Sequence, residues 1–95
     1  MRSIMPRVIR RRLAIHGYVQ GVGFRWAIAR AAESRGVAGW AANRADGTVE
    51  AVLEGEPGAV ESVIEICREG PRGARVDRVD VSDEPAEGIG GFETR

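Results

Sequence analysis

Apolar positions in the first third of the chain predict a strand followed by a helix. From Val8 to His16, the apolar residues Leu13 and Ile15 alternate with charged or small residues, which indicates a strand with one buried face. From Phe24 to Arg35, apolar residues recur at positions 24, 28, 31 and 32, which is the spacing of a helix with one buried side. Gly36 follows as a typical C-terminal cap of that helix.

The middle of the chain predicts a hairpin and a second helix. Val37 to Arg44 and Thr48 to Glu54 have the composition of strands, and the Asp-Gly pair in the intervening Ala45-Asp46-Gly47 is typical of a tight turn. Pro57 suits the first position of a helix that ends at Gly70. The apolar stripe of this helix consists of Val60, Val63, Ile64 and Cys67.

The end of the chain completes a βαββαβ order. Arg78 to Asp83 alternates as a fourth strand, and Phe92 to Arg95 can add a short fifth. This order predicts an α+β fold, a ferredoxin-like split-βαβ sandwich in which an antiparallel sheet carries both helices on one face. Because no internal repeat or linker divides the chain, we expect residues 7–95 to form a single domain and residues 1–6 to be frayed.

The segment GYVQGVGFR, from Gly17 to Arg25, has the composition of an anion-binding loop. Its glycines at 17, 21 and 23 allow positive φ angles, with which main-chain N–H groups can converge on a phosphate-sized anion. The following helix directs the positive end of its dipole at the loop, and Arg25 adds a permanently charged guanidinium. A plain strand-to-helix turn is the alternative. The chain has no lysine and no GxGxxG pattern, which excludes a nucleotide P-loop and a dinucleotide fingerprint.

Charge is unevenly distributed although the formal net charge is zero. Residues 1–30 contain seven arginines and no acidic residue, whereas residues 31–95 contain seven arginines and 14 acidic residues. The basic first third suits an anionic ligand. The zero net charge argues against a general nucleic-acid binder, so we expect a small partner and no nucleic acid.

Cysteine use and hydropathy suggest where the protein works. Cys67 is the only cysteine, which excludes an intramolecular disulfide and gives no sign of an oxidising compartment. No apolar run has the length of a signal-peptide core or of a membrane span. We therefore expect a cytoplasmic protein with no membrane partner.

Three blocks of sequence resemble the acylphosphatase family. They are the loop GYVQGVGFR, the block GWAANRADGTVEAVLEG from Gly39 to Gly55, and REGPRGARVDRV from Arg68 to Val79. They occur in register, and the likeness runs from Leu13 to about Val81. The chain departs from the family pattern at Ala41 and Thr94, where larger residues are usual, which bears on packing rather than on chemistry.

The resemblance implies an enzyme that hydrolyses acyl phosphates to a carboxylate and inorganic phosphate, by direct attack of water on phosphorus and without a metal or other cofactor. By the same resemblance, Arg25 binds the phosphate and Asn43 orients the attacking water. A cradle of backbone N–H groups is implied for Tyr18, Val19, Gln20, Gly21, Val22, Gly23 and Phe24. The chain length favours a monomeric enzyme. Because the implied contacts all hold the phosphoryl end of the substrate, we expect broad tolerance of the acyl group.

The chemistry of acyl phosphate hydrolysis explains why so few protein groups can be enough for catalysis. Phosphoryl transfer passes through a loose transition state with negative charge on the equatorial oxygens, which positioned donors and one guanidinium can stabilise. The departing carboxylate belongs to an acid with a pKa of roughly 4, so it leaves without a proton. Asn43 suits water positioning because its neutral amide can accept a hydrogen bond without repelling the phosphate.

For the other residues that could take part in catalysis or binding, a structural role is the simpler interpretation. His16 precedes the cradle, but strand alternation places it opposite Ile15 and the implied reaction needs no base. Cys67 lies on an apolar helical stripe, as a small buried thiol does. Trp40 and Phe24 sit at positions expected for packing. The acidic residues form charged surface rather than a metal site.

Two alternative functions share this fold. The same cradle could hold phosphate or carbamoyl phosphate without turnover, as a binding module. The βαββαβ order is also that of RNA-recognition domains, but the aromatic residues that such domains display on their central strands are missing. Leu13, Ile15, Val49 and Ala51 stand at the positions where such a domain would need exposed aromatic residues.

Overall fold

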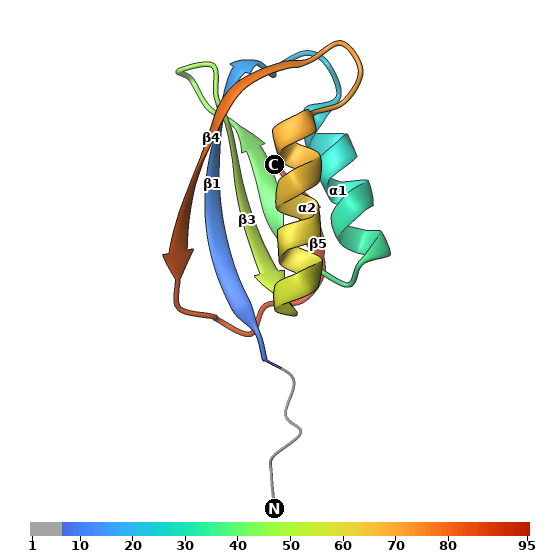
Figure 1. Cartoon of the computed structure of the whole chain (residues 1–95), viewed down its shortest axis with the longest axis vertical. Coiled ribbons are helices and arrows are strands. Elements are labelled where there is room, and N and C mark those ends of the chain that lie inside the picture. Colours follow the sequence, from blue (N-terminus) through green and yellow to red (C-terminus); the bar gives the residue numbers. More distant parts are fainter. Residues whose placement is uncertain (1–6) are drawn as a thin grey trace, which may run out of the picture.

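In the computed structural model of the chain, which describes residues 7–95, two helices lie along one face of a five-stranded sheet (Figure 1). The elements are β1 (Ile9–Tyr18), α1 (Phe24–Ser34), β2 (Ala38–Asn43), β3 (Val49–Gly55), α2 (Pro57–Glu69), β4 (Arg75–Glu84) and β5 (Phe92–Thr94). The predicted α+β, ferredoxin-like fold is confirmed. The expected frayed N-terminus concerns residues 1–6, which lie outside the described residues.

The sheet has the order β4-β1-β3-β2-β5. The pairs β4–β1, β1–β3 and β3–β2 are antiparallel, as expected. The short β5 joins β2 in parallel, with Gly39 opposite Phe92, so the sheet as a whole is mixed. β5 can pair in parallel because the linker of residues 85–91 crosses one end of the sheet. It carries the chain from β4, at one edge, to the opposite edge beside β2 (Figure 1).

Two strands are longer than the sequence pattern suggests. β1 continues past His16 to Tyr18, and β4 begins at Arg75 rather than at Arg78. The two extensions pair with each other, since Tyr18 lies opposite Arg75 across a register shift between His16 and Gly17. A glycine at this place suggests the end of a strand, whereas here it belongs to an irregular continuation of the ladder.

The core lies between the sheet and the helices. The predicted stripe of α1 is buried at Phe24, Ile28, Ala31 and Ala32, and that of α2 at Val60, Val63, Ile64 and Cys67. The sheet contributes residues with no exposed surface, among them Leu13, Ile15, Val49, Ala51 and Leu53. Neither helix is long and apolar enough to cross a membrane, within the residues described.

The burial pattern corrects one expectation about the sheet. Leu13, Ile15, Val49 and Ala51 pack under the helices, so they do not occupy the outward face on which an RNA-recognition domain displays its aromatic residues. Strand alternation gives that face to their neighbours instead. On the two central strands these neighbours include Arg10 and Arg12 of β1 and Glu50 and Glu54 of β3, which form ion pairs with one another.

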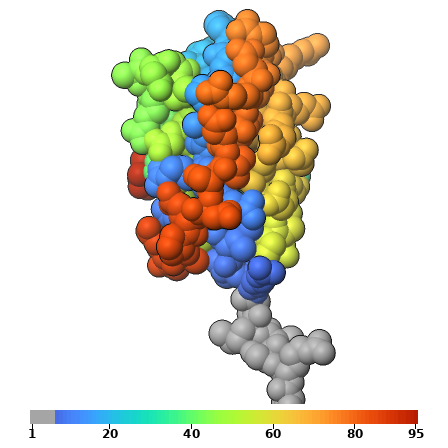
Figure 2. Space-filling view, turned by 60° about the vertical axis from the view of Figure 1, so that its left-hand side comes forward, coloured from blue at the N-terminus to red at the C-terminus, as the bar shows by residue number. Residues whose placement is uncertain are grey.

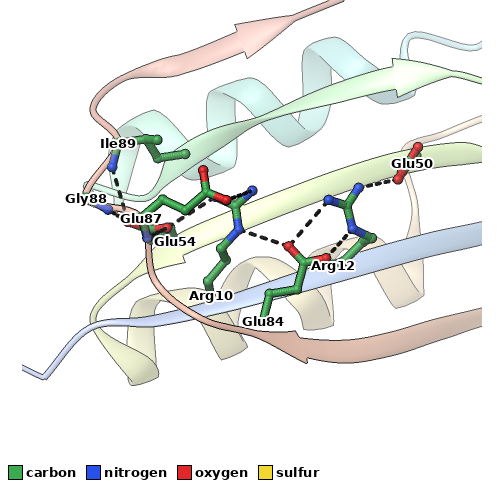
Figure 3. A network of polar contacts seen from close by, with 8 residues as sticks. All are labelled: Arg10, Arg12, Glu50, Glu54, Glu84, Glu87, Gly88 and Ile89. Atoms are coloured by element: carbon green, nitrogen blue, oxygen red, sulfur yellow. Dashed lines mark hydrogen bonds and ion pairs between the residues drawn. The ribbon is translucent and has the colours of Figure 1, made fainter.

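One end of the outward face is organised by a buried ion pair (Figure 3). Arg10 and Glu54 are 5% and 3% exposed, and Nη1 of Arg10 lies 3.2 Å from Oε1 of Glu54. The Glu54 carboxylate also accepts hydrogen bonds from the main-chain amides of Glu87, Gly88 and Ile89, at 3.0, 2.7 and 3.2 Å. Glu54 therefore anchors the linker that leads from β4 to β5.

The contacts that anchor the linker also lower the pKa of Glu54. Burial by itself raises the pKa, but the amides of Glu87 and Gly88 and the guanidinium of Arg10 outweigh it and lower the pKa below its ordinary value. Glu84 extends the network by accepting from Nε of Arg10 at 3.0 Å and from Nε of Arg12 at 2.5 Å. Figure 2 shows β4, which carries Glu84, along the edge of the sheet beside β1.

Replacing Glu54 should weaken the fold in a pH-dependent way. Glu54→Gln should lower the free energy of unfolding at neutral pH by about 2 kcal/mol, because Arg10 loses its buried charged partner. The lowered pKa means that this contribution is present above the unfolded-state pKa of about 4.3 and is lost as the pH falls through the folded-state pKa. Urea unfolding across an acid-to-neutral series should therefore give a flatter profile for the variant.

A control variant separates the anchor from general loss of charge. Glu65→Gln removes an exposed carboxylate that pairs with Arg68 on α2 at 3.2 Å. It should leave the free energy of unfolding nearly unchanged, because exposed pairs contribute little. Equal losses in the two variants would contradict the anchoring role of Glu54.

Candidate active site

The predicted cradle is the loop between β1 and α1. Gly17, with φ of 134°, lies in the irregular part of β1, where an added Cβ would be 2.0 Å from the carbonyl oxygen of Arg75. Only glycine allows this close approach. Gly23, with φ of 77°, is the N-cap of α1, and an added Cβ there would meet open space. Its requirement for glycine therefore comes from the backbone angle alone.

Main-chain donors of this loop are unpaired. No side chain caps the N-terminus of α1, in contrast to α2, where the Glu56 carboxylate accepts from the amides of Gly58 and Ala59. Among the described residues, the hydrogen bonds found include none donated by the amides of residues 19–26. Free amides at the positive end of a helix dipole form a binding place for an anion.

A cavity of about 240 Å³ adjoins the loop. Its lining consists of Val19, Gly21, Gly23, Phe24, Arg25, Trp26, Asn43 and Thr94. In Figure 1 the loop, the β2–β3 hairpin and the end of β5 lie at the same upper end of the molecule. The fold thus brings Arg25 of α1 and Asn43 of β2 to one cavity, together with four of the residues predicted for the cradle.

The remaining cradle residues do not line this cavity. Tyr18 is exposed at the end of β1, Val22 packs against the core, and Gln20 turns its side chain to the hairpin. Trp26 and Thr94 line the cavity although the sequence interpretation gave them no role there. A signal existed for Trp26, since this large aromatic residue follows Arg25 directly and falls outside the apolar stripe of α1.

Arg25 is held in place by the end of β5. Its Nη1 donates to the main-chain carbonyl oxygen of Arg95 at 2.7 Å. The amide of Arg95 in turn donates to the carbonyl oxygen of Ala41 in β2 at 2.8 Å. One side of the guanidinium is thereby fixed, which restricts the orientations of the remaining N–H donors.

Gln20 connects the cradle to the hairpin that follows Asn43. Its Nε2 donates to the carbonyl oxygens of Arg44 and Thr48, at 2.7 and 2.9 Å. Asn43 is the last residue of β2 and pairs with Val49 of β3. The sequence interpretation assigned Gln20 a main-chain role only, and its side chain proves to join the two segments that supply the candidate groups.

A larger hollow, of about 590 Å³, lies over the outward face of the sheet. Its charged residues are already engaged with one another or with neighbours: Glu50 pairs with both Arg12 and Arg44, and Asp80 lies 3.0 Å from His16 and pairs with Arg78. These groups are neutralised, whereas the donors of the cradle are unpaired. The smaller cavity is therefore the better candidate site.

The two other reactive side chains lie away from the cavity. His16 shares the outward face with Asp80, and neither residue lines the candidate site. Cys67 is buried in the core, and this burial raises the pKa of its thiol to about 12. Within residues 7–95, no group of three or more histidine, cysteine, aspartate or glutamate side chains could hold a metal ion.

Fold and cavity together define a small α+β protein with unpaired main-chain amides beside a cavity at a helix N-terminus. The chain matches the acylphosphatase family model over residues 11–94. It is 53% identical to an acylphosphatase of Thermococcus kodakarensis, over 90% of this chain and 93% of that protein. The crystal structure of acylphosphatase from Bacillus subtilis is 35% identical, with a TM-score of 0.89, covering 92% and 98% of the two chains.

A third comparison concerns a larger protein. Full-length HypF, in its phosphate- and nucleotide-bound form, matches 99% of this chain with a TM-score of 0.90 and 26% identity, but only 12% of its own length is covered. The chain belongs to the acylphosphatase family. It is an enzyme that hydrolyses acyl phosphates, which the relatives favour over a phosphate-binding module.

Gln20 offers a test of how the cavity is assembled. Gln20→Ala should lower the free energy of unfolding by about 1 kcal/mol, because two side-chain hydrogen bonds are lost. Amide hydrogen exchange, followed by NMR, should become faster at Arg44, Gly47 and Thr48, whose amides are hydrogen-bonded within the hairpin. Gln20→Glu should have a similar effect, since a carboxylate of the same length cannot donate to the two carbonyl oxygens.

Ser62→Ala provides the comparison, because it removes only an exposed hydrogen bond from Arg35 on the helical layer. Exchange at these hairpin amides should stay at the wild-type rate in that variant. Unchanged exchange in both Gln20 variants would mean that the side chain does not hold the loop to the hairpin.

Proposed function

We propose that the enzyme binds the phosphoryl group of an acyl phosphate with Arg25 and the main-chain amides of residues 18–24, of which those from residue 19 on are unpaired, and that Asn43 positions the attacking water. The observation that carries this proposal is the cavity itself. It combines unpaired main-chain donors, a fixed guanidinium and a neutral amide side chain within one small volume.

The electrostatics of the site suit phosphoryl transfer. As water attacks phosphorus and the bond from phosphorus to the acyl oxygen breaks, negative charge lies on the equatorial oxygens of the phosphoryl group. The amides and Arg25 are donors whose positions are set before the reaction, so they stabilise this charge without reorganising. The bonding electron pair leaves with the carboxylate, and the products are a carboxylate and inorganic phosphate.

Asn43 suits the role of water positioning for two reasons. Its place at the end of β2 brings it to the cavity while its main chain stays fixed by the pairing with Val49. Its amide oxygen can accept a hydrogen bond from water, and as a neutral group it does not repel the substrate phosphate. A carboxylate at the same position would place a second negative charge beside the phosphoryl oxygens.

The leaving group removes the need for further catalytic groups. A carboxylate is a weak base, so it departs without protonation by a general acid. His16 and Cys67 therefore have no part in the proposed reaction. We also propose that the reaction proceeds without a metal, because the donors of the cavity can supply the required charge stabilisation.

We further propose a monomer that works in the cytoplasm and binds no nucleic acid. Arg25, Asn43 and the loop line one cavity of the folded chain, so the proposed reaction needs no group from a partner. The single cysteine is a buried free thiol, as is usual in a reducing compartment. On the outward face, Arg10 and Arg12 are engaged by carboxylates, which leaves little positive charge there for a nucleic-acid backbone.

The proposed division of roles predicts different kinetics for two variants. Arg25→Ala should lose both turnover of benzoyl phosphate and affinity for inorganic phosphate, because it removes a charge that binds substrate and transition state alike. Asn43→Ala should lower kcat about a hundredfold or more and leave phosphate affinity within about twofold, because it affects only the water. Steady-state kinetics with phosphate as a competitive inhibitor measures both quantities.

Arg68→Ala removes an arginine from the exposed surface of α2 and should retain wild-type kinetics. Circular dichroism checks that each variant is folded, and EDTA should leave turnover unchanged. Equal loss of phosphate affinity in the Arg25 and Asn43 variants would refute the division of roles. A folded wild type that binds phosphate without hydrolysing acyl phosphates would instead favour a binding module.

A further inference from the structure

Two walls of the cavity have no part in the proposed binding of phosphate. The cradle residues and Arg25 face the phosphoryl group, and Asn43 belongs to the attacking water. The lining that remains consists of Trp26 from α1 and Thr94 from β5. Because the attacking and leaving oxygens lie in line on opposite sides of phosphorus, the acyl group must occupy space away from the water. Trp26 and Thr94 are the surfaces that remain for it.

Trp26 is unusually exposed for its size. Its exposed fraction is 64%, the largest among the four large apolar residues described as exposed. The other three are Val8, Tyr18 and Ile89, and none of them lines this cavity. A large exposed aromatic surface at the edge of a binding cavity is a typical place for an apolar part of a ligand.

The indole ring is also held in position before any ligand binds. The guanidinium of Arg30, one helical turn further along α1, lies 5.1 Å from the centre of the ring, within the range of a cation–π contact. This contact places the Arg30 guanidinium over the indole ring. A ring that is already oriented loses little freedom when a ligand stacks on it.

The cavity volume limits the acyl group to a small one. A volume of about 240 Å³ lies below the range of about 300 to 1,000 Å³ that is usual for sites of drug-sized ligands. A phosphoryl group with one planar ring suits this volume and offers a face for stacking. A short aliphatic group such as acetyl also fits, but it cannot reach or cover the indole to the same extent.

We propose that Trp26 forms a subsite for the acyl group and favours substrates with a planar aromatic acyl group, such as benzoyl. This inference rests on the proposed function, because it takes the positions of phosphate and water from it. The subsite adds a moderate preference to the broad tolerance expected from the sequence, since every other proposed contact holds the phosphoryl end. Acetyl and benzoyl phosphate are both substrates, with the aromatic one favoured.

The test is the ratio of kcat/KM for benzoyl phosphate to kcat/KM for acetyl phosphate. In Trp26→Ala this ratio should fall about tenfold, because the stacking surface is removed. The value of kcat/KM for acetyl phosphate should stay within about twofold of wild type. Trp26→Phe, which keeps an aromatic surface, should retain most of the wild-type ratio.

Trp40→Phe is the matched control, because Trp40 lies outside the cavity and packs beside Arg95, whose guanidinium is 4.5 Å from its ring. It should leave the substrate ratio unchanged. Inhibition by inorganic phosphate should be the same in wild type and in all three tryptophan variants. This measurement, with circular dichroism, shows that the phosphate site and the fold are intact.

Each other outcome has a definite meaning. An unchanged ratio in Trp26→Ala overturns the subsite and leaves the proposed function intact. Equal losses for both substrates, with weaker phosphate inhibition, assign Trp26 to the cradle and also overturn it. If the wild type hydrolyses neither substrate, the proposed function itself fails.

Discussion

The unpaired main-chain amides between β1 and α1 are the feature on which the rest of the site depends. Amides without partners are costly in a folded protein unless water or a ligand satisfies them. Here the glycine at the N-cap provides no side-chain acceptor, whereas α2 begins with a glutamate that provides one. The loop therefore stays available for an anion, and its shape has to be maintained by contacts from outside the loop.

Two such contacts are present, one to the hairpin and one to the residue that follows β5. Gln20 ties the loop to the hairpin, and Arg25 is tied to β5 through the carbonyl oxygen of Arg95. At the other end of the molecule, the buried pair of Arg10 and Glu54 holds the linker that delivers β5 to its edge position. The position of the Arg25 guanidinium thus depends on a strand whose own placement is fixed by charges at the far end of the sheet.

The proposed hydrolysis of acyl phosphates needs little from the protein besides the positioning of these groups. A good leaving group and a transition state with charge on exposed oxygens need donors at fixed places, rather than an acid, a base or a nucleophile. The fold can therefore confine the reaction to one small cavity and use the remaining walls for the acyl group. In the proposed arrangement, Trp26 and Thr94 are the part of the lining that is left to distinguish one acyl phosphate from another.

The sequence by itself determined the order of the elements, the buried stripes of both helices and the glycine loop with Arg25. These features depend on local periodicity and backbone geometry, which neighbouring residues encode. Tertiary structure alone decided the parallel pairing of β5, the outward face of the sheet and the side-chain contacts of Gln20. It also decided that Asn43, Trp26 and Thr94 line one cavity with the loop, because strand register brings together residues that lie far apart in the chain.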